Sequence, residues 1–98
     1  MAAKNQDCPL NEVIKTASEC VIAAEEQGLQ IDTSVGIGPF SERPAGCYKW
    51  NGFNGTKGAS FNTILDPSST SPMHNSAGLC KKGNIVYLRM VLFIIYLI

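Results

Sequence analysis

The sequence predicts a small α+β domain that is rich in loops and stabilised by disulfide bonds. In this fold class, one amphipathic helix packs on a short antiparallel β-hairpin or three-stranded sheet. Three observations lead to it. The chain has 98 residues, which suits one domain with a modest core that benefits from cross-links. It contains four cysteines. A capped helical pattern is followed by two strand-like segments around a turn rich in Asn and Gly.

The cysteines lie far apart in the sequence, at Cys8, Cys20, Cys47 and Cys80. Zinc sites hold their ligands as close pairs such as C-x-x-C, so we expect disulfides and neither a metal nor a cofactor. The alternative is four buried free thiols in a reducing compartment. Four cysteines allow three pairings, and we prefer Cys20–Cys47 with Cys8–Cys80, because the second pair would tie the ends of the module together. Disulfides indicate an extracellular or organelle-lumenal protein.

The clearest local signal is a helix in the segment TASECVIAAEEQGL, residues 16–29. Thr16 and Glu19 have the S/T-x-x-E spacing of a capping box. Gly28 is placed to end the helix in the left-handed conformation, and Leu29 to fold back on the last turn. An apolar stripe at helical spacing predicts the buried face: Ala17, Cys20, Val21 and Ala24.

Two strands are predicted after a Gly-, Ser- and Pro-rich loop. The first is GCYKW (46–50), in which Cys47 and Lys49 face one way and Tyr48 and Trp50 the other. The second is ASFNTIL (59–65), and the intervening NGFNGTKG suits a hairpin connection. A further polar loop leads to LCKK, which we predict as a short third strand.

The order of these motifs resembles a cysteine-rich module that recurs in secreted and surface proteins of microalgae and other protists. The matching stretches are CVIAAEEQGL (20–29), RPAGCY (43–48), FN (61–62) and SAGLCK (76–81). The resemblance extends from about Cys8 to Lys81. It implies an extracellular, non-catalytic building block of larger proteins, or a peripheral subunit of an algal assembly, and it supplies no ligand-binding residue. The apolar tail and the missing signal peptide depart from the pattern.

No catalytic set is evident, and we predict that the protein is not an enzyme. The single histidine, His74, lies in a Ser- and Pro-rich loop, where solvation is more usual than nucleophilic catalysis. The formal net charge is zero and charges of both signs are interspersed, so nucleic acid is not an expected partner.

A binding surface is the more plausible role for the hairpin region. Tyr48, Trp50 and Phe53 supply aromatic faces that suit a sugar ring or an apolar side chain, and Arg43 is close in sequence. For Trp50 and Tyr48 the alternative is a place in the core. Asn54 begins an N-glycosylation sequon, NGT, in a predicted surface loop, which would make the protein a glycoprotein.

We divide the chain into an N-terminal extension (1–7), the disulfide-stabilised module (8–82) and an apolar tail (83–98). The first ten residues contain no apolar signal-peptide core, so export would require a sequence outside this one or prior processing. Residues 85–98 form an apolar run interrupted by Arg89, shorter than the roughly 20 residues of a membrane span. It fits a buried strand, a truncated membrane anchor or translated non-coding sequence.

From the sequence we therefore expect a non-enzymatic binding or adhesion module that recognises a glycan or a protein. The alternative is a structural, peripheral subunit of a membrane-associated assembly, such as an algal photosynthetic one, held by residues 85–98.

Overall fold

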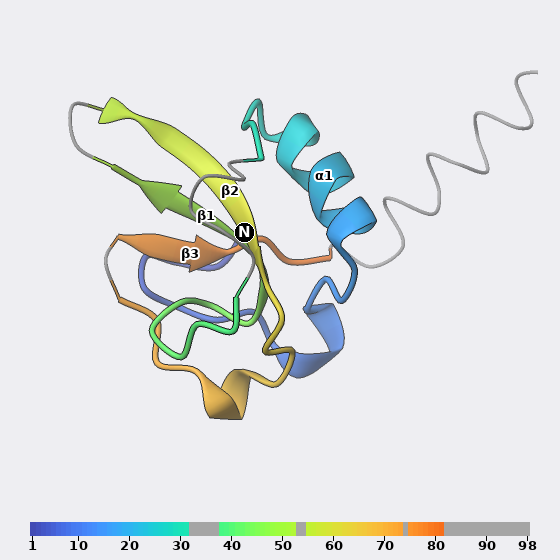
Figure 1. Ribbon diagram of the computed structural model, residues 1–98, viewed down its shortest axis with the longest axis vertical. Coiled ribbons are helices and arrows are strands. Elements are labelled where there is room, and N and C mark those ends of the chain that lie inside the picture. The colour runs from blue at the N-terminus through green and yellow to red at the C-terminus, as the bar shows by residue number, and fades with distance from the viewer. Residues whose placement is uncertain (32–37, 53–54, 74, 82–98) are drawn as a thin grey trace, which may run out of the picture.

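The computed structural model describes residues 1–31, 38–52, 55–73 and 75–81. It confirms the predicted class, a small disulfide-stabilised α+β domain with one helix and a three-stranded antiparallel sheet (Figure 1). The sheet order is β2-β1-β3, so β1 is the central strand. The elements in chain order are η1 (Leu10–Glu12), α1 (Ala17–Glu26), β1 (Gly46–Asn51), β2 (Lys57–Asn62), η3 (Pro67–Ser69) and β3 (Ser76–Gly78).

Helix α1 begins where its capping residue predicts. Thr16 has an extended backbone, and its hydroxyl oxygen accepts a hydrogen bond from the Glu19 amide at 3.2 Å. The reciprocal half of the capping box differs from the prediction. The Glu19 carboxylate accepts a hydrogen bond from the Thr16 hydroxyl at 2.9 Å and lies 3.5 Å from the Lys81 ammonium. Glu19 therefore links the helix start to the segment that follows β3.

The end of α1 is a Schellman motif, as the Gly-Leu pair predicts. The Leu29 amide donates to the Ala24 carbonyl and the Gly28 amide to the Glu25 carbonyl, with Gly28 at a φ of 68°. Leu29 is buried. The predicted buried stripe is only half right: Cys20 and Ala24 are buried, but Ala17 and Val21 are exposed. The neighbouring Ala23 packs against the core instead, so the buried face is rotated from the predicted one.

Strands β1 and β2 form the predicted hairpin, with Cys47 opposite Phe61 and Tyr48 opposite Ser60. β2 starts two residues before the predicted segment and ends at Asn62, three residues before its predicted end. The third strand also differs, because β3 comprises Ser76–Gly78 rather than LCKK. Cys80 lies beyond it and forms an isolated bridge with Val13.

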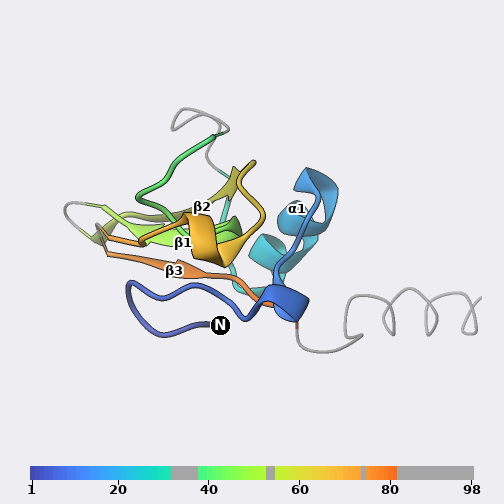
Figure 2. The same ribbon diagram turned by 90° about the horizontal axis from the view of Figure 1, so that it is seen from below.

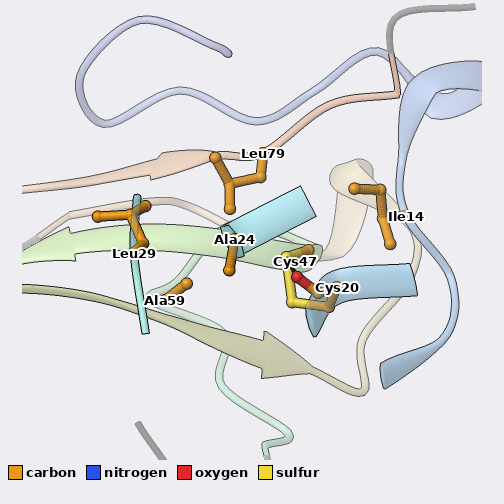
Figure 3. Packing of buried hydrophobic residues seen from close by; sticks show 7 residues of the cluster. All are labelled: Ile14, Cys20, Ala24, Leu29, Cys47, Ala59 and Leu79. Carbon is orange, nitrogen blue, oxygen red and sulfur yellow. Dashed lines mark hydrogen bonds between the residues drawn. A yellow bond between two sulfur atoms is a disulfide. The ribbon is translucent and has the colours of Figure 1, made fainter. Parts of the chain in front are cut away.

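Both disulfides have the pairing that we prefer from the sequence. Cys20–Cys47 joins α1 to the central strand, and Cys8–Cys80 joins the N-terminal region to the segment after β3, with Cα–Cα distances of 5.2 and 5.4 Å. No cysteine is free. The main core surrounds the first bridge and draws side chains from the helix, the sheet and the connecting segments (Figure 3). Its buried members are Ile14, Cys20, Ala24, Leu29, Cys47, Ala59 and Leu79.

The N-terminal segment that precedes Cys8 makes hydrogen bonds with the sheet. Residues 2–6 run along the outer edge of β3 and form a strap (Figure 2). The Ser76 and Gly78 carbonyls accept hydrogen bonds from the Asn5 and Ala2 amides. The Gly78 amide donates to the Gln6 carbonyl, and the Ser76 amide donates to Asn5 Oδ1 at 3.3 Å. The strap therefore pairs all the outward-facing backbone groups of Ser76 and Gly78, which an edge strand would otherwise expose.

The sheet face opposite α1 is covered by two loop segments, residues 38–45 and 63–73. They pair with each other through hydrogen bonds from the Ser71 and Met73 amides to the Ser41 and Glu42 carbonyls. Asn62, fully buried at the end of β2, ties the first loop to the sheet. Its Nδ2 lies 2.7 to 3.3 Å from the carbonyl oxygens of Phe40, Arg43 and Pro44. Its Oδ1 accepts from the Phe40 and Ile64 amides.

A second polar contact fixes the same layer. One Asp7 carboxylate oxygen accepts a hydrogen bond from the Ala45 amide, and the other accepts from the Thr70 hydroxyl, both at 2.7 Å. Asp7 thus connects the N-terminal region to both covering loops.

The start of β1 requires glycine. Gly46 has a φ of 68°, and a Cβ there would collide with the Ile14 carbonyl oxygen and lie 2.7 Å from a Val13 methyl carbon. The close approach of β1 to the segment before α1 therefore explains the glycine directly before Cys47.

Candidate functional site

Trp50 is partly exposed, unlike Tyr48, the other described residue of the predicted aromatic set. Trp50 lies near the C-terminal end of β1, on the sheet face opposite the helix. Its indole N–H donates to the Ser60 hydroxyl oxygen at 3.3 Å. Its ring packs over the backbone of Gly58 in β2, where a Cβ atom would lie 2.8 Å from indole Cε2. Contacts with β2 therefore hold the indole in one orientation. Strand β1, which carries Trp50, is cross-linked to α1 through Cys47.

Tyr48 belongs to the core and not to a binding surface, which corrects its predicted role. The side chain is fully buried, and it lies on the same face as Trp50 because the two are separated by one residue in a strand. Trp50 is only partly covered, whereas Tyr48, two residues nearer the middle of the domain, is closed off from solvent. Its hydroxyl has no hydrogen-bond partner of good geometry among the residues that the structure describes.

Burial raises the pKa of the Tyr48 phenol above its ordinary value of 10.0, while the Arg43 charge and the Ser60 hydroxyl act in the opposite direction. The folded state thus holds this proton more tightly than the unfolded state. The resulting stabilisation is present below pH 10 and is lost as the pH rises from there through the folded-state pKa.

Tyr48→Phe tests this environment. At neutral pH we expect a free energy of unfolding that is unchanged within about 1 kcal/mol, or higher, because the substitution removes a buried hydroxyl without a good partner. Urea denaturation at pH 8 and pH 11 should show a smaller loss of stability at high pH for the variant than for the native protein. An equal loss in both would mean that Tyr48 retains an ordinary pKa.

Arg43 lies on the same side of the sheet as Trp50 and is partly buried. Its charge acts on the Tyr48 phenol, and its backbone is fixed by two contacts: the amide donates to the Phe40 carbonyl, and the carbonyl accepts from Asn62 Nδ2. The predicted pair of Trp50 and Arg43 therefore shares one face of the sheet. The other predicted functional positions, Phe53, Asn54, His74 and residues 85–98, lie outside the described residues.

Sequence reasoning missed the two residues that shape this face, Asn62 and Asp7. Asn62 carries a faint signal, because it belongs to the FN pair of residues 61–62 that the sequence analysis singles out. Its contacts with residues 40–44 explain physically why an FN pair and an RP-x-GCY segment occur together in this chain. Asp7 carries no signal of its own, since its partners lie 38 and 63 residues away.

A second surface feature is an open hollow of about 470 Å³ beside the N-terminal strap. It is lined by Met1, Ala2, Ala3, Lys4, Gln6, Asp7, Pro9, Glu12 and Cys80. Within the described ranges, no group of three or more His, Cys, Asp or Glu side chains is arranged to hold a metal ion.

Comparison with known proteins adds no relative: no protein family, no curated protein and no solved structure matches this chain. In the part of the chain that the structure describes, none of the helices has the length and apolar character needed to cross a membrane.

Proposed function

We propose that this protein is a non-enzymatic extracellular or lumenal binding module, and that its ligand is a glycan recognised by Trp50. The observation that carries the proposal is the state of the indole, which is partly exposed and yet fixed by Gly58 and Ser60. Tyr48, on the same face of β1, is by contrast fully covered.

A fixed aromatic face is suited to a sugar ring. The apolar face of a pyranose packs on an aromatic ring, and little conformational entropy is lost when that ring is already held in place. Arg43 supplies a cation on the same side of the sheet, which can orient hydroxyl or carboxylate groups of the ligand. The two disulfides are in keeping with an oxidising compartment, where glycans are abundant.

Binding to a glycan array, followed by titration of the best glycan, tests the role of Trp50. We expect Trp50→Ala to weaken binding about tenfold or more, the loss of roughly 1.4 kcal/mol of stacking and burial, with the helical circular dichroism retained. Trp50→Phe should keep part of the affinity. Because Trp50 is the only tryptophan, its fluorescence in the native protein should also change on binding.

Lys49→Ala is the matched control, because Lys49 lies in the same strand and its side chain points to the opposite face of the sheet. This variant should bind like the native protein. Equal affinity of folded Trp50→Ala and native protein would contradict the proposal. Absence of glycan binding together with Trp50-dependent binding of a protein would replace the glycan by a protein ligand.

A further inference from the structure

The two disulfides differ in their access to solvent. Cys20 and Cys47 are both completely buried in the main core, between α1 and β1. In the second bridge Cys8 is 2 % exposed, but Cys80 is partly exposed. Cys80 also lines the open hollow beside the strap, so a small thiol can approach it from that side.

We propose that Cys8–Cys80 is a thiol–disulfide exchange site whose substrates are dithiol reductants, and that its reduction releases the N-terminal strap from β3. A thiolate must reach a sulfur atom along the disulfide axis, so access selects the bond and the atom that react. Access through the hollow makes Cys80 Sγ the attacked atom.

The reaction transfers two electrons. One thiolate of the dithiol attacks Cys80 Sγ, the Sγ–Sγ bond breaks, and Cys8 leaves as a thiolate. The second thiol of the reductant then attacks the reductant's first sulfur, which is bonded to Cys80 in the mixed disulfide, and Cys80 leaves. The reductant becomes a cyclic disulfide, and its two thiol protons end on Cys8 and Cys80.

The strap lies close to this bond in the chain, because only Asp7 separates it from Cys8. Asp7 itself is held by the Ala45 amide and the Thr70 hydroxyl. The strap is attached to β3 by backbone hydrogen bonds to Ser76 and Gly78 and by the hydrogen bond from the Ser76 amide to Asn5 Oδ1. Short hydrogen-bonded segments without a packed apolar face open readily. Five of the six residues at positions 1–6 are exposed beyond one third of their surface, including Ala3, Lys4 and Gln6. Once the cross-link is cut, the cost of opening this edge falls.

The remainder of the domain has its own cross-link. Cys20–Cys47 and the packing of Ala24, Leu29 and Ala59 around it do not involve the strap. Reduction of Cys8–Cys80 is therefore a local event that leaves α1 on the sheet and uncovers the outer edge of β3.

Pulsed reduction of the full chain with dithiothreitol, followed by alkylation and peptide mass spectrometry, tests the exchange site. We expect Cys8 and Cys80 to be alkylated together, about tenfold or more faster than Cys20 and Cys47. Simultaneous labelling of all four cysteines, or earlier labelling of Cys20 and Cys47, would overturn the proposal.

Hydrogen exchange of the partly reduced protein tests the release of the strap. The adjacent amides of Gly78 and Leu79 form a built-in comparison, because Gly78 donates to the strap and Leu79 donates to the Cys47 carbonyl in β1. Protection should fall at Asn5 and Gly78 and persist at Leu79. Retained protection at Gly78, or loss at both neighbours, would contradict local release. The doubly substituted C8S/C80S protein should show the same exchange pattern without reductant.

Discussion

Asn62→Ala is expected to lower the free energy of unfolding by about 3 kcal/mol or more, which is a large share of the roughly 5–15 kcal/mol typical of a domain. The substitution leaves the Phe40 and Ile64 amides without their acceptor and removes the donor for the Phe40 and Pro44 carbonyls. Each buried polar group that loses its partner costs about 1–3 kcal/mol, reduced where water can enter. Urea denaturation measures the change.

Asn51→Ala is the control, because Asn51 is an exposed asparagine at the end of β1 in the same hairpin. It should change stability by less than about 0.5 kcal/mol. A loss at Asn62→Ala as small as that at Asn51→Ala would show that the loop over the sheet does not depend on this side chain.

Asn62→Asp separates hydrogen bonding from size. The introduced carboxylate keeps the acceptor for the two amides but faces three carbonyl oxygens without a proton to donate. Burial and these carbonyls should raise the pKa of the new group, so the variant should be least stable at neutral pH and should regain stability as the pH falls through that pKa.

Removal of the buried disulfide is expected to have the second large effect. Cys20→Ala/Cys47→Ala should cost about 3–4 kcal/mol, because the bridge closes a loop with a sequence separation of 27 residues and lies at the centre of the core. Two of the five other buried residues in this core are alanines, so the core has little apolar area to compensate. Thermal unfolding followed by circular dichroism measures the loss.

The comparison variant is Cys8→Ser/Cys80→Ser, in which the helix remains bonded to the sheet. We expect it to retain the helical signal at temperatures at which Cys20→Ala/Cys47→Ala has lost it. Helix loss at the same temperature in both variants would mean that the buried bridge has no special part in holding α1.

The features that the sequence predicts well are those set by neighbouring residues. Thr16 and Gly28 mark the ends of α1 because capping depends on residues within one turn. The Asn- and Gly-rich segment marks the hairpin, and the wide spacing of the cysteines favours disulfides. The buried face of α1 is less certain from pattern alone, because Ala17 and Val21 satisfy the same period as Cys20 and Ala24.

The features that escape prediction depend on residues far apart in the chain. The strap pairs Asn5 with Ser76, across 71 residues, and thereby sets where β3 lies. Strand alternation places Tyr48 and Trp50 on one face, but the layer that buries only Tyr48 comes from loops without periodic pattern. The candidate site is therefore half predicted. The sequence identifies the strand, but it does not show which of the two aromatic residues is exposed.

Two cross-links hold the small core together, and disulfide mapping of the natural protein tests this most directly. Non-reducing digestion and mass spectrometry should recover a peptide pair joined through Cys20 and Cys47 and another joined through Cys8 and Cys80, with no alkylation before reduction. Reduction of both bonds should abolish cooperative unfolding near room temperature. A protein whose four thiols are all alkylated in the native state, and which still unfolds cooperatively, would contradict it.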